Sequence, residues 1–182
     1  MAVMTTADVS SPRIDIPSPG RYRISAAGST VTIRTRHLFG LGPVRATLDL
    51  RDGRVLVTEP PAASSVQARF SVASFQSGSG ARDAAVLSPR LLDAAAYPTL
   101  SFTSTQLVEE QGEWSLRGEL EVRGVTRLVE ARITALAADA ATIRASAKVG
   151  LDRYDFGLTT YRGLAARRLT IDLEIIAHRE QS

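Results

Sequence analysis

Beyond residue 20, apolar and polar side chains alternate with a period of two along most of the chain. In one stretch, Trp114, Leu116 and Leu120 alternate with polar and charged side chains. This period is typical of strands with one buried and one solvated face. Eight long stretches share it, namely 31–35, 44–50, 66–72, the segment beginning at 100–102, 114–122, 129–135, 143–151 and 169–175. A short leading piece around 22–24 precedes them.

Short connections join most of these strands. Asp52-Gly53, Gln111-Gly112 and Gly124 supply residues that tight turns prefer. Sequential strands with one apolar face and short turns predict an antiparallel meander. Closure of eight strands into a barrel removes the exposed sheet edges, and an even number makes the first and last strands antiparallel. We therefore expect an all-β fold, an eight-stranded antiparallel up-and-down barrel.

Two segments depart from the strand pattern. Residues 1–20 are rich in proline and show no periodicity, so we expect a flexible N-terminal arm followed by a single domain over 21–180. Residues 74–99 hold the segment 81–87 and then a Ser-Pro pair, in which serine suits a helix N-cap and proline the first helical position, so a second short helix could begin there. One short helical insertion is expected there.

Several side chains on the inward faces are small, among them Ala68, Gly118 and Ala145. An eight-stranded barrel can either be filled by its side chains or hold one small ligand. A filled core that alternates large and small residues is the alternative to a cavity. The alternation places no charged side chain on the inward faces of these strands, so any tunnel should be apolar. The expected lining comprises Ala46, Leu48, Ala68, Phe70, Phe102, Trp114, Leu116, Ala131, Ile133, Ala145, Ala147 and Ile171.

The direction of successive strands predicts which loops share an end of the barrel. Loops 37–43, 74–99, 123–126 and 152–167 fall at the end reached by the first long strand, and the shorter turns fall mostly at the other. This distribution is typical of a cup with a decorated mouth. It depends on 55–58 extending a hairpin rather than crossing the barrel as a separate strand.

Composition excludes several kinds of site. The 182 residues include no cysteine and two histidines, which excludes disulfides, thiolate metal sites and multi-histidine metal sites. No basic stripe with interleaved aromatic residues favours nucleic acid. No run approaches the ~20 apolar residues of a membrane helix, so we expect no integral membrane segment. No secretory leader is recognisable, and a cytoplasmic location is expected.

Few residues could support catalysis. No serine lies in a Gly-x-Ser-x-Gly elbow, and no paired carboxylates lie on inward faces. His37 could anchor a ligand head group, act as an acid or base, or make only structural hydrogen bonds. An enzyme acting on a bound lipid, with His37 as base and Arg153 or Arg82 holding an anion, is the alternative to a binding protein.

Four motifs resemble those of the YceI-like family. The first includes Arg82-Asp83 and the segment 97–104, which reads YPTLSFTS. The second, 118–126, reads GELEVRGVT, and the third, 153–158, reads RYDFGL. The early strand that ends at His37 fits the fourth. Order and spacing agree from about residue 22 to residue 177, nearly the whole chain.

This resemblance implies a lipocalin-like barrel with an apolar tunnel for a polyisoprenoid, isoprenoid quinone or fatty-acid type of lipid. It also implies a ligand-binding mouth made of His37, Arg82, Asp83, Tyr97, Arg153, Asp155 and Phe156. The chain departs from the family at two points. Ser25 stands where the family usually has aspartate, and the leader peptide of the secreted members is missing. We expect carriage, storage or sensing of the lipid, no catalytic residue, no metal and no cofactor besides the lipid. A monomer and a homodimer both remain open.

The loop 152–167 permits a more detailed prediction. In an extended stretch Arg153 and Asp155 point to the same side, and Tyr154 and Phe156 to the other. We therefore expect Phe156 to cap the tunnel. Arg153 and Asp155 should pair with Asp83 and Arg82 across the mouth, in pairs partly shielded from solvent.

Overall fold

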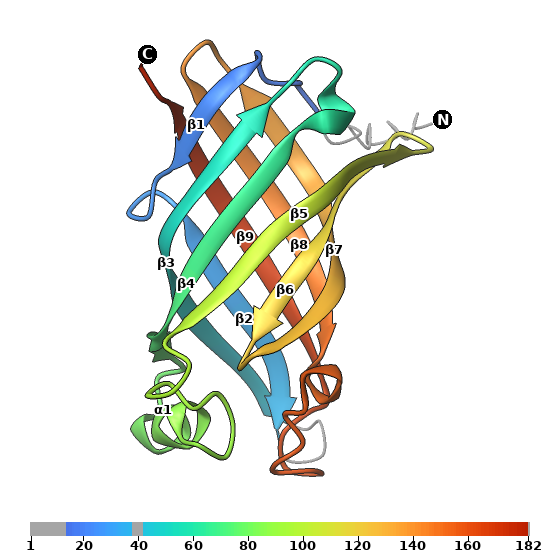
Figure 1. Ribbon diagram of the computed structural model, residues 1–182. Coiled ribbons are helices and arrows are strands. Elements are labelled where there is room, and N and C mark those ends of the chain that lie inside the picture. Colours follow the sequence, from blue (N-terminus) through green and yellow to red (C-terminus); the bar gives the residue numbers. More distant parts are fainter. Residues whose placement is uncertain (1–13, 38–41, 182) are drawn as a thin grey trace, which may run out of the picture.

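The computed structural model describes residues 14–37 and 42–181, and the chain there forms a β-barrel (Figure 1). Its strands are β1 (Gly20–Ile24), β2 (Thr30–His37), β3 (Gly42–Val57), β4 (Ser65–Gln76), β5 (Thr99–Glu110), β6 (Glu113–Val122), β7 (Val125–Ala138), β8 (Thr142–Asp152) and β9 (Arg168–Arg179). The described residues also include the helix α1 (Gly80–Leu87) and the short 3₁₀ helices η1 (Pro61–Ala63) and η2 (Arg153–Phe156).

The strands close into an eight-stranded antiparallel barrel, which confirms the predicted fold class. Consecutive strands pair from β2 to β9, and β9 pairs back to both β1 and β2. Both β1 and β2 run antiparallel to β3, with Arg23 opposite Arg54 and Val31 opposite Leu48. The two strands therefore share one position in the barrel, as a single strand interrupted at 25–29, and the nine strands fill eight positions.

The prediction of a turn at Asp52-Gly53 is wrong. The chain continues through it as part of β3, with Asp52 opposite Arg69 and Gly53 opposite Ala68. A β-bulge between Leu50 and Asp52 absorbs the irregularity. Glycine is used here for close packing, since a Cβ on Gly53 would lie 2.6 Å from Cδ1 of Ile24. The segment 55–58 adds no separate crossing, so the expected strand directions hold.

Two other predicted turns are confirmed. Gln111-Gly112 and Arg123-Gly124 each connect a pair of strands, and all four residues have positive φ between 51° and 81°. Positive φ at both central residues is the requirement of the type I′ turn, whose twist matches that of a β-hairpin. Each connection needs only these two adjacent residues with positive φ, so it is short.

The expected helical insertion is present as α1. The Ser79 side chain accepts a hydrogen bond from the Arg82 backbone N–H at 3.4 Å, and Asp83 lies in the first turn. A side-chain acceptor at the N-cap and a carboxylate in the first turn both stabilise the N-terminus of a helix, which is the positive end of its dipole. The Ser-Pro pair that follows does not begin a second α-helix, because residues 89–92 and 94–96 form hydrogen-bonded turns. No helix in the described residues is long and apolar enough to cross a bilayer.

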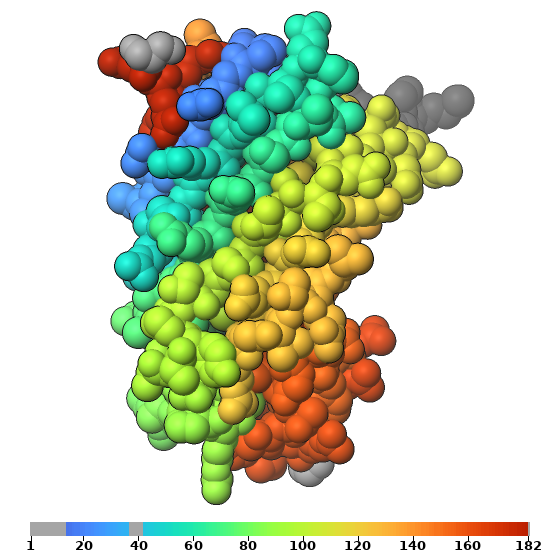
Figure 2. Space-filling model, in the orientation of Figure 1, coloured from blue at the N-terminus to red at the C-terminus, as the bar shows by residue number. Residues whose placement is uncertain are grey.

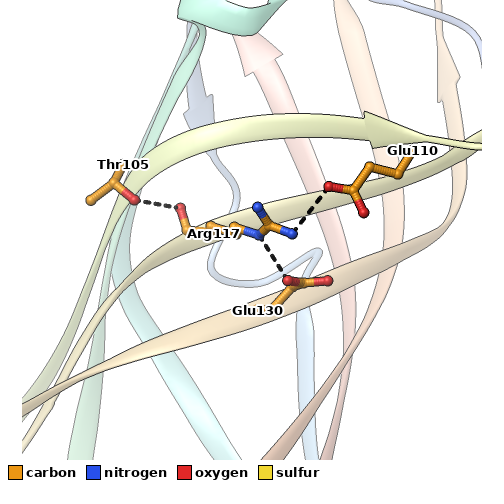
Figure 3. A network of polar contacts seen from close by, with 4 residues as sticks. All are labelled: Thr105, Glu110, Arg117 and Glu130. Atoms are coloured by element: carbon orange, nitrogen blue, oxygen red, sulfur yellow. Dashed lines mark hydrogen bonds and ion pairs between the residues drawn. The ribbon is translucent and has the colours of Figure 1, made fainter.

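The outer face of the barrel carries cross-strand ion pairs. Arg117 on β6 lies opposite Glu130 on β7, and its Nε donates to Oε2 of Glu130 at 2.9 Å (Figure 3). A second contact, at 3.4 Å, joins Arg117 to Glu110 on β5. The hydrogen bond that Arg117 donates to Glu130 is the main cause that holds the pKa of Glu130 below its ordinary value of 4.5. The network spans three strands on the solvated face, away from the inner wall.

The two ends of the barrel differ in character (Figure 1). One end, here called the loop end, carries segments 77–98, 123–124 and 153–167. The opposite end, the hairpin end, carries 58–64 and the shorter turns. On the face drawn in Figure 2, the strands form a continuous wall, and the two long loop-end segments extend from one end of it. The predicted gathering at one end is therefore observed for loops 74–99, 123–126 and 152–167, whereas the loop predicted at 37–43 lies largely outside the described residues.

Part of the segment expected to be a loose arm contacts the barrel. Ile14 forms a parallel bridge with Leu136 of β7, and the Asp15 N–H donates to the Leu136 carbonyl at 2.8 Å. The guanidinium of Arg179 on β9 donates to the carbonyls of Pro19 and Ser18 at 3.1 and 3.4 Å. Residues 14–19 therefore lie against the hairpin end.

Candidate ligand cavity

An elongated cavity of about 580 Å³ occupies the interior of the barrel. Its lining extends from Ile16 and Pro61 at the hairpin end to Val86 and Leu164 at the loop end. This volume falls within the roughly 300–1,000 Å³ of pockets that hold one small organic ligand. Among the described residues, the buried apolar side chains form three clusters, joined only through the partly buried Phe70 and Leu100, as expected when the centre of a barrel is not filled.

Every residue expected to line the tunnel borders this cavity. The set comprises Ala46, Leu48, Ala68, Phe70, Phe102, Trp114, Leu116, Ala131, Ile133, Ala145, Ala147 and Ile171. They come from seven strands, and alternation along each strand directs them inward. Their shared property is an apolar side chain, so the wall offers a ligand dispersion contact and shelter from water.

Strict alternation misses some lining residues because β-bulges change the face. A register shift between Ile133 and Ala135 makes Leu136, rather than Ala135, the next cavity residue on β7. Another shift between Ser104 and Gln106 brings Leu107 to the cavity on β5. An extra residue in one strand moves all later side chains to the opposite face, and the sequence carries no clear signal of where that residue lies.

The charged groups that border the cavity are few and of one sign. Among the described residues they are Arg36, Arg82 and Arg153, and no carboxylate accompanies them. Arg36 lies near the end of β2, Arg82 in α1 and Arg153 at the start of η2. These elements all reach the loop end. The cavity is therefore apolar along its length, with cationic groups at one end only.

Arg153 is buried, with only 6% of its surface exposed, and it organises the loop that follows it. Its Nε donates to the carbonyl of Ala166 at 2.9 Å, and Nη2 donates to that of Ala165 at 3.1 Å. Nη1 donates to the carbonyls of Leu158 and Thr160. One planar guanidinium thus fixes both sides of the 158–166 loop. Burial lowers the pKa of Arg153, and the nearby Arg162 acts in the same direction.

The predicted pairing of Arg153 with Asp83 is wrong. Asp83 instead accepts hydrogen bonds from the backbone N–H and the hydroxyl of Ser77, at 3.0 and 2.5 Å. Arg82 donates from Nη1 to the Ser77 hydroxyl at 3.3 Å. Asp155 is exposed and has no ion pair or hydrogen bond within the described part of the chain.

The helical turn η2 explains why the extended-strand assumption failed. In a 3₁₀ helix, residues three apart lie above one another, so Arg153 and Phe156 share the buried side. Phe156 is 4% exposed, borders the cavity and packs with Leu158. The two long loops do meet, but through another contact, because the Thr160 hydroxyl donates to the Arg90 carbonyl at 2.7 Å.

Of the remaining predicted mouth residues, Tyr97 does not border the cavity, and the side chain of His37 cannot be placed. Tyr97 is 38% exposed, and its ring covers the turn at Gly124, where a Cβ would lie 3.2 Å from Cε1 of the tyrosine. His37 ends β2 opposite Gly42, and its side chain lies outside what the structure describes. Tyr154, which the extended geometry placed on the same side as Phe156, has the guanidinium carbons of Arg153, Arg162 and Arg167 within 5.1 Å of its ring centroid.

The model of the YceI-like domain matches residues 22–177, which is the barrel from β1 to β9. The chain belongs to the YceI-like family. Two curated relatives, the proteins YceI of Salmonella arizonae and Salmonella paratyphi B, are each 29% identical over 164 residues. Each alignment covers 85% of this chain and 84% of the relative. The family assignment agrees with the resemblance carried by the four sequence motifs.

Solved structures of related proteins share the fold. The crystal structure of Burkholderia cenocepacia BcnA matches with a TM-score of 0.76 at 21% identity, covering 84% of this chain and 98% of that protein. A polyisoprenoid-binding domain from Saccharophagus degradans matches with a TM-score of 0.65 at 12% identity, covering 90% and 100%. A Campylobacter jejuni YceI protein matches with 0.58 at 20% identity, covering 72% and 84%.

Proposed function

We propose that this protein binds one long apolar lipid, of the polyisoprenoid, isoprenoid quinone or fatty-acid type, along the axis of its barrel. The observation that carries the proposal is the elongated cavity of about 580 Å³ with an apolar wall. Each CH₂ group that leaves water for such a wall contributes about 0.8 kcal/mol. A long unbranched or isoprenoid chain can make this contact along most of its length, whereas a compact polar ligand cannot.

The comparisons support this proposal. The chain belongs to the YceI-like family, and the Saccharophagus degradans structure with the same fold is described as a polyisoprenoid-binding domain. The small side chains of Ala145 and Ala147 leave space next to larger neighbours in the wall. Carriage, storage and sensing of a lipid all require this binding step, and the proposal covers each of them.

We propose a binding role rather than a catalytic one. The charged residues that border the described cavity are arginines, whose guanidinium groups stay protonated and are poor general acids or bases near neutral pH. A guanidinium is suited instead to holding an anion by hydrogen bonds and charge. A bound lipid should therefore leave the protein chemically unchanged.

Native mass spectrometry of protein purified without detergent tests the proposal directly. We expect an adduct of one lipid per chain whose mass after extraction identifies it. The neutral fluorophore N-phenyl-1-naphthylamine should also bind at about one per chain, with a negative heat-capacity change from apolar burial. An adduct-free protein that shows no saturable fluorophore binding would contradict the proposal. If the identified lipid is incubated with the protein and is converted to a product, the non-catalytic role is contradicted.

A further inference from the structure

The cavity has a direction, because its two ends differ in charge. At the hairpin end the lining includes Ile14, Ile16, Pro17 and Val57, and no charged residue of the described chain borders that end. The three bordering arginines all lie at the loop end. A ligand with two chemically different ends would therefore have one preferred orientation.

Arg153 is a buried cation at the loop end, held mainly by neutral partners. Four of its five N–H groups donate to backbone carbonyls, which supply hydrogen bonds but no negative charge. Within the described residues no carboxylate forms an ion pair with it, and the neighbouring Asp152 pairs with Arg167 at 2.6 Å. Asp152 is near enough to interact with Arg153 by charge but forms no ion pair with it. A buried cation that lacks a direct ion pair is costly, so an anion placed nearby is stabilised.

Other cations reinforce this field at the same end. Arg162 and Arg167 both lie beside the Tyr154 ring, at 5.1 and 5.0 Å from its centroid. The segment 152–168 holds four arginines and two acidic residues, Asp152, which pairs with Arg167, and Asp155, which is exposed, so it keeps a positive net charge. Clustered charges of one sign beside a low-dielectric cavity concentrate ligands of the opposite sign.

We propose that the ligand is a single-chain amphiphile whose acidic head, a carboxylate or a phosphate, faces Arg36, Arg82 and Arg153 while its tail extends towards the hairpin end. This inference rests on the proposed lipid-binding function and adds the chemistry of the head and the orientation of the tail. Guanidinium groups recognise both kinds of oxyanion through charge and N–H donors. Four of the five donors of Arg153 are engaged by carbonyls, so this residue would act chiefly through its charge. A fatty acid and an isoprenoid phosphate share this chemistry, and the test distinguishes them.

Hexadecanol, hexadecanoic acid and hexadecyl phosphate have the same tail and differ in the head. Each is used to displace N-phenyl-1-naphthylamine at pH 8, where both acids are ionised. We expect one or both acids to bind at least about tenfold more tightly than the alcohol, with a gap that narrows as salt screens the charges. Preference for the carboxylate indicates a head of the fatty-acid type, and preference for the phosphate indicates a phosphate head, as in an isoprenoid phosphate. Equal affinities, or tighter binding of the alcohol, overturn the inference and leave the proposed function standing. Failure of the fluorophore and all three ligands to bind is failure of the proposed function itself.

Arg82→Gln removes one cation from the cavity with little change in side-chain volume. It should weaken binding of the preferred acid about tenfold and leave hexadecanol binding unchanged, which also reports that the barrel is folded. Arg90→Gln is the matched control, because Arg90 lies on the same loop-end segment but does not border the cavity. An equal loss of acid binding in both variants, or none in Arg82→Gln, overturns direct recognition by Arg82.

Spin-labelled fatty acids test the orientation in the unmodified protein. The nitroxide of 5-doxyl stearic acid lies near the head, and that of 16-doxyl stearic acid lies near the end of the tail. The first should broaden amide NMR signals of α1 and 158–166, and the second those around Pro61 and the hairpin end. The reverse pattern, or the same pattern from both probes, overturns the proposed orientation.

Discussion

The ring of Phe102 on β5 occupies the space that a side chain at position 118 on β6 would need. A Cβ on Gly118 would lie 2.6 Å from two atoms of this ring and 2.6 Å from the Thr103 carbonyl oxygen. The sequence suggested that Gly118 leaves empty volume on the inner wall, but the neighbouring aromatic ring fills that volume. The glycine is thus a condition for the position of Phe102, which borders the cavity.

Gly118→Ala should destabilise the barrel by about 1–3 kcal/mol, because overpacking displaces either the ring or the backbone of the adjacent strand. Urea denaturation measures the change in free energy of unfolding. Gly150→Ala on β8 is the matched control, since a Cβ there meets nothing within 4 Å, and it should be neutral or slightly stabilising. Equal effects of the two substitutions would show that Phe102 adjusts without cost.

Ala147→Trp should abolish binding of N-phenyl-1-naphthylamine while the barrel stays folded. Ala147 borders the cavity and lies on β8 between Ile133 and Leu173, so an indole there would obstruct the tunnel. Fluorescence titration measures binding, and circular dichroism reports the fold. Lys148→Trp places the same side chain at the next, outward position and should bind normally. Normal binding by Ala147→Trp would mean that the fluorophore does not occupy this part of the cavity.

Arg153→Ala should destabilise the protein by about 1.5–3 kcal/mol, the range for hydrogen bonds that involve a charged group. Hydrogen exchange should become faster across 158–166, because the carbonyls on both sides of that loop lose their donor. Arg153→Lys should restore little, since an ammonium cannot span the same set of acceptors. Unchanged exchange in 158–166 after Arg153→Ala would contradict the role of this guanidinium in the loop.

A double-mutant cycle of Arg153→Ala with Asp83→Ala should give a coupling energy near zero, within about 0.5 kcal/mol. Asp83 has Ser77 as its partner, and Arg153 has backbone carbonyls, so the two side chains share no hydrogen bond. Urea denaturation of the two single variants and the double variant measures the coupling. A coupling above about 1 kcal/mol would restore the ion pair that the sequence suggested.

Arg117→Gln should raise the pKa of Glu130 towards its ordinary value of 4.5, because the main hydrogen bond that lowers it is lost. In the unmodified protein the folded-state pKa lies below that of the unfolded chain. The ionised carboxylate therefore stabilises the fold fully above the pKa of the unfolded chain, and this contribution is lost as the pH falls through the folded-state pKa. NMR titration of the side-chain carbonyl measures the shift. Glu110→Gln removes only the longer contact and should leave the pKa of Glu130 nearly unchanged.

The helical turn η2 at the loop end is a place where the local sequence pattern predicted the wrong conformation. Extended geometry placed Arg153 and Asp155 on one side, but η2 places Arg153 with Phe156 and leaves Asp155 exposed. The choice between the two conformations depends on the carbonyls of residues up to 13 positions later, with which Arg153 forms its hydrogen bonds. No feature of the motif at 153–158 reveals those partners.

The sequence by itself determined the all-β class, the barrel and most of its inner wall, because a period of two assigns each side chain to a face without knowledge of the neighbouring strand. It also determined the turn at Gln111-Gly112, where the two residues that need positive φ are adjacent. Only the tertiary structure decided that β3 continues through Gly53, that Leu136 faces inward and that carbonyls hold Arg153. Each of these depends on a contact between residues distant in the chain, and such contacts exist only once the barrel has closed.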